Sequence, residues 1–357
     1  MAAIRKTVHG TFEVYGYKVI NGQKKRFSKS FKTRADARRY LAQTELTIEE
    51  RSAQIVLSAL IDEYIVKVTS KKRSKRTEEA RLRRIQRTDL GQLNLSNISR
   101  KTIERYIQER LNEQAYHRDN TVAPSTVNRE LATLSDVFNF GIENGLTEEN
   151  PCKGAERPKD PEHRERVATE EDIEKLLLAS GWDGVSKPKN LTELSIAAFL
   201  FSCRTGMRSG EILKIEKAWI DGNVLHVPAE ATKTLSRRDV ALSSFALETL
   251  SLILALGFEP KIFGPLNDKN RDTLFRKVRD RAGLGPEFDS EGRLIREGLH
   301  FHDGRATFAT WAASTDPETG APRLDVLALA RQTGHKNLKH LARYYRASAA
   351  EIAKRLK

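Results

Sequence analysis

Residues 194–211 read LSIAAFLFSCRTGMRSGE, and they join an apolar stretch to a cluster of polar and charged side chains. The apolar run from Leu194 to Ser202 predicts a buried helix. The segment Thr205-Gly206-Met207-Arg208-Ser209-Gly210-Glu211 follows directly after it. This juxtaposition makes residues 205–211 the first of four short stretches in which chemistry-bearing residues gather.

The other three stretches lie further along the same part of the chain. Two predicted strands, 224–228 and 238–242, form a hairpin whose tip holds Ala231-Thr232-Lys233-Thr234. The next stretch is His302-Asp303-Gly304-Arg305, and the last is Thr333-Gly334-His335, with Tyr344 nine residues beyond the histidine. Helices are expected over 169–178, where Thr169 begins a capping box, and over 273–282, 307–313, 324–331 and 337–355, the last with a break.

Length, composition and charge restrict the class of protein. The 357 residues allow two or three domains, and 39% hydrophobic content suits globular cores. Lys and Arg number 62 against 48 Asp and Glu, a net charge of +14, which favours a polyanionic partner, either nucleic acid or an acidic membrane face. Membrane spans and a signal peptide are not expected, and the two cysteines, Cys152 and Cys203, are too few for a disulfide framework. We therefore expect a cytoplasmic protein, nucleoid-associated in a bacterial host, with nucleic acid as partner.

The first 52 residues are expected to form a small basic module. Residues 11–20 alternate aromatic and β-branched side chains with others, Asn21-Gly22 predicts a hairpin turn, and residues 24–31 predict a second strand. Thr33 can cap a helix that runs to about residue 50. Residues 1–50 hold 11 Lys and Arg against 5 Asp and Glu. A basic sheet can enter the major groove, although such a sheet can also pack on the rest of the protein without touching bases.

Residues 53–150 predict an all-helical domain with helices over 55–68, 77–88, 101–115 and 125–143. Residues 151–168, rich in charge and proline, predict a linker to a domain over 169–357. The fold class is thus mainly α with small β-sheets (α+β). A second basic cluster begins at Lys71, and it suits either a solvated helix face or phosphate contact. The candidate DNA-binding residues of the two clusters are Lys18, Lys24, Lys25, Arg26, Lys29, Lys71, Lys72, Arg73, Lys75 and Arg76.

The four stretches together resemble the tyrosine recombinases, the phage-integrase family. That family pattern has an Arg in a T-G-x-R-x-x-E box, a Lys on a β-hairpin, an H-x-x-R box, a G-H step, and a Tyr nine residues after that His. All five features occur here in order across about 140 residues. One departure is Ala306, which stands where many relatives carry a second His outside the catalytic set. The first 150 residues resemble the family's arm-type DNA-binding domain followed by its core-binding domain.

The resemblance implies a role for each residue. Arg208 and Arg305 would clamp the scissile phosphate, because guanidinium groups bind phosphate oxygens bidentately and stay charged. Tyr344 would be the nucleophile, with Tyr345 as the competing candidate, and Lys233 would protonate the leaving oxygen. His302 and His335 would donate to phosphate oxygens, and His302 could also take the tyrosine proton. Glu211 and Asp303 would orient these basic groups.

The sequence therefore predicts a site-specific DNA integrase of a phage or other mobile element, acting through a 3′-phosphotyrosyl intermediate without metal or nucleotide cofactor. The resemblance also implies a homotetramer on double-stranded attachment sites, an accessory DNA-bending protein and an excisionase. A type IB topoisomerase uses a similar residue set on one duplex, and a relaxation assay without attachment sites separates the two. A non-catalytic DNA-binding regulator and a metal-dependent nuclease are further alternatives, the latter tested by activity in EDTA.

Overall fold

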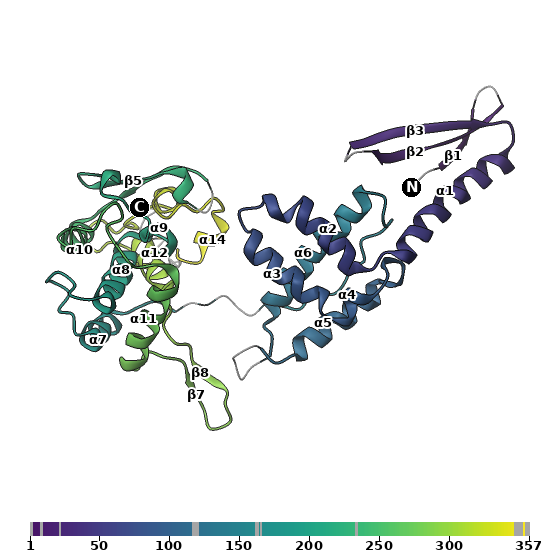
Figure 1. Ribbon diagram of the computed structural model, residues 1–357. Coiled ribbons are helices and arrows are strands. Elements are labelled where there is room, and N and C mark those ends of the chain that lie inside the picture. The colour runs from purple at the N-terminus through teal and green to yellow at the C-terminus, as the bar shows by residue number, and fades with distance from the viewer. Residues whose placement is uncertain are drawn as a thin grey trace. The chain divides into compact units, whose positions relative to one another are not determined.

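The computed structural model describes residues 3–7, 10–20, 23–115, 121–160, 164, 166–232, 235–345 and 353, apart from the side chains of 17–20, 23–26 and 42–51. The chain forms two compact units, Met1–His163 and Arg164–Lys357 (Figure 1). Helices dominate both, and the strands form small antiparallel sheets. This confirms the predicted α+β class.

A three-stranded sheet begins the first unit, in the order β1 (Ala3–Lys6), β2 (Phe12–Ile20) and β3 (Gln23–Phe31). The β2–β3 pairing confirms the predicted hairpin. The Thr33 hydroxyl accepts a hydrogen bond from the Asp36 amide at 3.1 Å and thereby caps α1 (Arg34–Gln54). Val14 of the sheet and Ala37 of the helix are fully buried, because α1 packs across the sheet.

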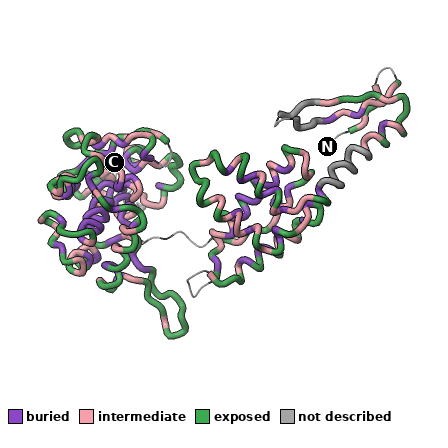
Figure 2. The backbone as a smooth tube through the Cα atoms, viewed as in Figure 1, coloured by how far each residue is buried: buried purple, intermediate pink, exposed green. Residues whose placement is uncertain are grey.

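The rest of the first unit is helical, as predicted, with elements α2 (Leu57–Lys67), η1 (Thr69–Lys71), α3 (Lys75–Gln86), α4 (Asp89–Gln92), η2 (Leu95–Asn97), α5 (Arg100–Asn112) and α6 (Pro124–Glu143). The apolar face predicted for the first of these helices is buried at Leu57, Leu60, Ile61, Tyr64 and Ile65. These side chains join buried residues of α3, α5 and α6 in one core, which Figure 2 shows as the purple interior of this block.

The second unit is built around α8 (Leu191–Thr205), the helix predicted from the apolar run. It packs against most of the other helices of the unit, and its buried side chains form the centre of the core (Figure 2). The remaining elements are α7 (Glu170–Ser180), α9 (Ser209–Ile212), η3 (Lys217–Trp219), β4 (Ile220–Asp221), β5 (Val224–Val227), η4 (Ala229–Ala231), β6 (Arg238–Ala241), α10 (Ser244–Leu254), α11 (Asp268–Arg281), β7 (Glu287–Phe288), β8 (Leu294–Arg296), α12 (Asp303–Ala313), α13 (Val326–Thr333) and α14 (Lys339–Ala342).

Several of these boundaries differ from the sequence prediction. The expected hairpin is present as β5 and β6, and β4 adds a third strand to it. The helix expected from residue 307 begins at Asp303, because the residues of the H-x-x-R box form its first turn. The helix α10 and the hairpin of β7 and β8 were not predicted. Of the helix expected over 337–355, α14 is described, whereas residues 346–352 and 354–357 lie outside the described part of the chain.

Gln332 of α13 connects the elements that carry three of the four sequence stretches. Its side chain donates to the carbonyl oxygen of Thr205 at the end of α8 (3.1 Å) and to that of Ala241 in β6 (3.0 Å). Its oxygen accepts from the Ala241 amide at 3.0 Å. Buried hydrogen bonds of this kind fix relative position, because leaving any of these groups unpaired would cost about 1–3 kcal/mol. The C-terminus of α8, the hairpin strand and α13 therefore meet at one place.

Candidate active site

Two helices end in left-handed glycines whose carbonyl oxygens face the candidate arginines. Gly206 ends α8 with φ +68°, and Gly334 ends α13 with φ +70°. The Gly206 oxygen accepts from Arg305 Nη1 at 2.6 Å, and the Gly334 oxygen accepts from Arg208 Nη2 at 3.1 Å. A helix C-terminus carries partial negative charge, so each guanidinium sits where cations are favoured. This explains why a T-G step precedes both the Arg208 and the His335 positions.

Glycine is also required at these two turns for space. A Cβ on Gly206 would lie 2.6 Å from a ring carbon of Phe308, and one on Gly334 would lie 3.0 Å from the side chain of Arg238. Any other residue would both strain the positive φ and push these neighbours away. The close approach of α8 to α12, and of α13 to the hairpin, therefore depends on the glycines of the two boxes.

One carbonyl oxygen links the two arginines. The Thr333 oxygen accepts from Arg305 Nη1 at 2.6 Å and from Arg208 Nη1 at 3.4 Å. The side chain of Arg305 is buried, with 4% of the residue exposed, whereas Arg208 is partly exposed. Burial, together with the charges of Arg208 and Arg238, lowers the pKa of Arg305 to about 9, which still leaves it charged at neutral pH. The arrangement presents two fixed positive groups side by side.

His335 lies against this pair. The Thr333 hydroxyl donates to the Leu329 carbonyl (2.6 Å), so its oxygen accepts from His335 Nδ1 (2.7 Å), and Nε2 faces Arg305 Nη2 at 3.1 Å. Burial, followed by the charges of Arg305 and Arg208, lowers the pKa of His335 to about 3. The ring is therefore neutral at physiological pH, with one nitrogen oriented by its threonine partner.

His302 and Lys233 complete the predicted basic set. His302 immediately precedes α12, and partial burial, followed by the Arg305 charge, lowers its pKa, so this ring is also neutral and able to accept a proton. Lys233 follows η4 in the β5–β6 connection and lies outside the described residues. The structure thus brings together Arg208, His302, Arg305 and His335 from three of the four stretches. It does not test the position of Lys233, in the remaining stretch.

The two adjacent tyrosines occupy different environments. The hydroxyl of Tyr345 donates to the Leu324 carbonyl oxygen at 2.9 Å, and burial raises the pKa of Tyr345 to about 12. Tyr344 is partly buried, with the Arg343 guanidinium 5.0 Å from its ring centre, and it interacts electrostatically with Arg305. The Tyr345 hydroxyl is therefore held in a structural hydrogen bond, whereas Tyr344 lies within electrostatic range of Arg305.

Sequence reasoning missed Arg238, the first residue of β6. Its Nη1 and Nη2 donate to the two carboxylate oxygens of Glu211, each at 2.9 Å, and Glu211 also accepts from the amide (3.1 Å) and Nη1 (3.3 Å) of Arg208. Burial alone would raise the pKa of Glu211, but the hydrogen bonds and charge of Arg238 lower it, so the carboxylate stays charged. Glu211 thus orients Arg208, as predicted for a supporting residue, and Arg238 holds Glu211. In the sequence, nothing distinguishes Arg238 from its neighbour Arg237, so its role could not be predicted.

A family model described as the phage integrase family matches residues 166–351, more than half of the chain. The chain belongs to this family. It is a site-specific tyrosine recombinase. An integrase/recombinase homologue of Haemophilus influenzae is 34% identical over 330 residues, which cover 90% of this chain and 82% of that protein.

Solved structures agree on the fold. A lambda integrase dimer bound to a COC′ core site superimposes with a TM-score of 0.64 at 18% identity and covers 96% of this chain and 94% of that chain. A lambda integrase tetramer bound to a Holliday junction superimposes with a TM-score of 0.61 at 18% identity, covering 94% and 95%. The recombinase therefore shares its fold with enzymes whose structures were determined on DNA.

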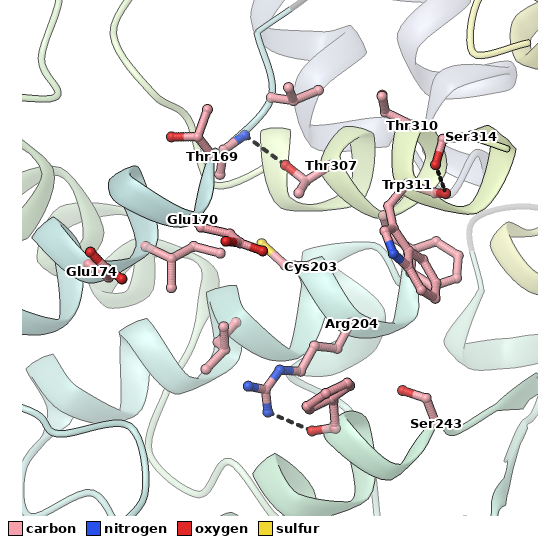
Figure 3. Close-up of a pocket in the computed structure, with 16 residues that line it drawn as sticks. Thr169, Glu170, Glu174, Cys203, Arg204, Ser243, Thr307, Thr310, Trp311 and Ser314 are labelled. Atoms are coloured by element: carbon pink, nitrogen blue, oxygen red, sulfur yellow. Dashed lines mark hydrogen bonds between the residues drawn. The ribbon is translucent and has the colours of Figure 1, made fainter. Parts of the chain in front are cut away.

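A separate pocket of about 630 Å³ lies on the second unit of the recombinase. Its walls come from the segment before α7 and from α7, α8, α10 and α12, with Cys203, Thr307 and Trp311 among them (Figure 3). Arg208, His302, Arg305, His335 and Tyr344 do not line it. In the described ranges, no three His, Cys, Asp or Glu side chains gather in a way that could hold a metal ion.

The predicted DNA-binding lysines and arginines fall into three groups. The side chains of Lys18, Lys24, Lys25 and Arg26 lie outside the described part of the structure. Lys29, Lys71, Arg73, Lys75 and Arg76 are exposed. Lys72 is half-buried, and its ammonium group donates to Glu78 (2.9 Å) and to the Tyr64 hydroxyl (2.8 Å). None of the helices that the structure describes is long and apolar enough to cross a membrane.

Proposed function

We propose that the recombinase cuts and rejoins DNA at attachment sites through a 3′-phosphotyrosyl intermediate on Tyr344. Arg208 and Arg305 bind the non-bridging oxygens of the scissile phosphate, with His335 beside them. His302, neutral at physiological pH, accepts the tyrosine proton. Lys233 protonates the leaving oxygen.

The excess of positive charge around Gly334 supports this proposal most strongly. Three guanidinium groups, those of Arg208, Arg238 and Arg305, converge there, and Glu211 is the carboxylate that contacts two of them. Like charges at this spacing repel, and that repulsion contributes to the lowered pKa of both Arg305 and His335. An anion bound between Arg208 and Arg305 removes the repulsion, and a phosphodiester is an anion whose oxygens match two guanidinium forks.

The chemistry follows from the same groups. The Tyr344 oxygen attacks phosphorus, the bond from phosphorus to the 5′ oxygen breaks, and the Lys233 ammonium transfers a proton to that oxygen, which leaves as a 5′-hydroxyl. Negative charge that develops on the non-bridging oxygens meets guanidinium groups already fixed by the Gly206, Thr333 and Gly334 carbonyls, so little reorganisation is needed. A 5′-hydroxyl of the partner strand then reverses the steps and joins the exchanged ends.

We further propose that four copies of the chain act on two duplexes and that the reaction inserts or excises a phage or other mobile element. The lambda integrase tetramer on a Holliday junction supports this stoichiometry by likeness of fold. The proposal includes an accessory DNA-bending protein and an excisionase as further partners. It places the enzyme in the cytoplasm, on the nucleoid of a bacterial host.

We propose that the first module, residues 1–52, binds secondary arm sites and that residues 53–150 bind the core site. Residues 151–168 link these domains to the catalytic domain, residues 169–357. Among residues 1–44 the acidic side chains are Glu13 and Asp36, which supports DNA contact. Glu13 is paired with Arg5 at 2.7 Å, and Asp36 lies at the start of α1. The test is a deletion of residues 1–54, which removes the module up to the end of α1. If the footprint on long attachment-site DNA were unchanged by this deletion, the arm-site assignment would be wrong.

The nucleophile is tested with nicked suicide substrates, which trap the covalent protein–DNA adduct. Tyr344→Phe should bind the site with unchanged affinity and form no adduct, because only the attacking oxygen is lost. Tyr345→Phe is the matched control, since it removes a neighbouring hydroxyl that is bonded to Leu324. If Tyr344→Phe formed the adduct and Tyr345→Phe did not, the nucleophile would be Tyr345 and the assignment to Tyr344 would be wrong.

A further inference from the structure

The end of the predicted linker lies against α12, the helix that carries Arg305. Arg164 and residues 166–168, which we call the strap, precede α7 and belong to the second unit. Arg164 Nε and Nη2 donate to the two carboxylate oxygens of Asp303, at 3.2 and 2.7 Å. Arg164 Nη2 also donates to the Gly298 carbonyl oxygen, and Nη1 lies 3.2 Å from Glu297. One side chain of the strap therefore contacts both the start of α12 and the segment leading into it.

Asp303 lies in the chain between His302 and Arg305, the two predicted catalytic residues at the start of α12. It is the first residue of the helix, follows His302 directly and precedes Arg305 by two positions. Its side chain is 8% exposed, and it accepts the backbone amide of His300 at 2.7 Å in addition to Arg164. A carboxylate this buried depends on its cationic partner, because an uncompensated buried charge costs several kcal/mol. Arg164 thus stabilises the local backbone from which His302 and Arg305 project.

A second bond holds the strap to the same turn. The amide of Ala168 donates to the Thr307 hydroxyl at 2.8 Å (Figure 3). That hydroxyl in turn donates to the Asp303 carbonyl oxygen at 2.9 Å. The start of α12 is therefore bonded to the strap through the Asp303 carboxylate and through the Thr307 hydroxyl. A helix end held at two points has less freedom to tilt or fray than one held by its own hydrogen bonds.

We propose that Arg164 is a positioning residue for strand cleavage, acting through Asp303 on the placement of Arg305 and His302. This inference rests on the proposed function, because it presumes that Arg305 stabilises the transition state. Displacement of a positioned group by about 1 Å can lower a rate about 100-fold, so loss of this ion pair affects chemistry more than DNA affinity. A sequence-distant linker residue then belongs to the catalytic apparatus without touching the phosphate.

The strap itself offers a closely matched control. Arg166 Nη2 bonds Asp172 at 2.9 Å, with side-chain exposures of 23% and 8% for the two partners. The corresponding values for Arg164 and Asp303 are 22% and 8%. The two pairs share chain segment, residue types and burial. They differ in the helix that bears the carboxylate, α7 for Arg166 and α12 for Arg164, and Arg164 also contacts Gly298 and Glu297. Only the pair on α12 should influence cleavage.

The experiment compares Arg164→Gln and Arg166→Gln in the full chain on nicked suicide substrate at saturating DNA. We expect Arg164→Gln to slow adduct formation tenfold or more with site affinity within twofold, and Arg166→Gln to cleave within twofold of the wild type. Arg164→Lys, which restores the charge, should recover part of the lost rate. Thermal unfolding of both Gln variants is measured alongside, so that cleavage is compared at a temperature at which both variants remain folded.

Equal rates for the two Gln variants, or no recovery in Arg164→Lys, would overturn the inference. If Arg164→Gln does not fold, Arg164→Lys is compared with Arg166→Lys: a slower rate in Arg164→Lys alone supports positioning, and equal rates overturn it. Arg305→Lys is measured in parallel. Wild-type cleavage by Arg305→Lys would refute the proposed function, whereas slow cleavage by Arg305→Lys with normal cleavage by Arg164→Gln would refute the role of Arg164 alone.

Discussion

Arg238 and Glu211 face each other through two hydrogen bonds of 2.9 Å, and this pair ties the hairpin that carries Lys233 to the turn that carries Arg208. The two side chains are 10% and 3% exposed. Bidentate geometry fixes orientation as well as distance, so the pair aligns two separate stretches of the site. Neither residue has to touch DNA for this alignment to affect the reaction.

Arg238→Gln should therefore reduce the cleavage rate at saturating DNA about tenfold or more and destabilise the second unit by about 3–5 kcal/mol, because it leaves Glu211 buried with a weaker partner. Cleavage of suicide substrates and thermal unfolding measure the two effects. Arg237→Gln is the matched control, since it removes the adjacent and exposed guanidinium. Equal behaviour of the two variants would remove Arg238 from the supporting structure of the site.

The convergence of the catalytic stretches could be predicted from the sequence only in outline. The order and content of the boxes around Arg208, Arg305 and His335 predicted that they share a site, and the structure joins them through the Thr333 carbonyl. Arg238 and Arg164 could not be predicted, because an arginine at a strand start or in a linker has no periodicity or spacing that marks its partner. Their roles depend on carboxylates 27 and 139 positions away, which only tertiary packing brings near.

The helix boundaries were likewise predictable only where the sequence pattern reports burial. The amphipathic helices of the first unit were predictable because apolar spacing reports burial directly, as at Leu60 and Ile61. The start of α12 was placed four residues too late, because His302 and Asp303 are polar and give no apolar period. The local signal there is instead the aspartate that accepts the His300 amide.

DNA binding by the recombinase should take up a proton at His335. The pKa of His335 is about 3 in the free protein, well below its usual 6.5, because of burial and two neighbouring arginines. A bound phosphate offsets those charges and raises the pKa, so affinity should increase as the pH falls from about 7.5 toward 5.5. Calorimetry in two buffers of different ionisation enthalpy, at about pH 6, measures the uptake.

His335→Gln should abolish that increment of proton uptake, whereas His226→Gln, on the exposed face of the β5–β6 hairpin, should leave it intact. The stability of the free protein should change with pH in the opposite direction to its DNA affinity. A histidine whose folded pKa is depressed binds fewer protons folded than unfolded between pH 6.5 and about 3, so stability is lost as the pH falls through that range. Proton uptake that persists in His335→Gln would assign the titration to another group.

Arg110 should be essential for the stability of the helical block. Its Nε and Nη2 bond both oxygens of Glu130, at 2.9 and 2.7 Å, and the Tyr106 hydroxyl also donates to Glu130 at 2.8 Å. Arg110→Met leaves a buried carboxylate without its cation, which should cost about 3–5 kcal/mol. Arg105→Met on the same helix breaks an exposed pair with Glu109 and should cost under about 1 kcal/mol. Calorimetric unfolding of the full chain compares the two, and similar melting shifts would contradict the assignment.

The basic cluster at the start of α3 should divide into residues that contact phosphate and a residue that stabilises the fold. Lys75 and Arg76 are exposed and line, with Arg83, Arg84 and Arg87, a hollow of about 600 Å³. Replacing both with Gln should weaken site binding and reduce the slope of log K against log salt concentration by about 1.8, since each phosphate contact contributes about 0.9.

Lys72, although adjacent in sequence, should behave differently. Its bonds to Glu78 and to the Tyr64 hydroxyl keep the ammonium group engaged inside the helical block and raise the pKa of Lys72 against the opposing effect of burial. Lys72→Gln should therefore lower stability by about 1–2 kcal/mol and leave the salt dependence of DNA binding unchanged. Binding isotherms at several salt concentrations, with thermal unfolding of each variant, separate the two effects. If Lys72→Gln reduced the slope as strongly as a change at Lys75 or Arg76, the ion pair with Glu78 would have to open on DNA, and the whole cluster from Lys71 onward would act as one phosphate-binding surface.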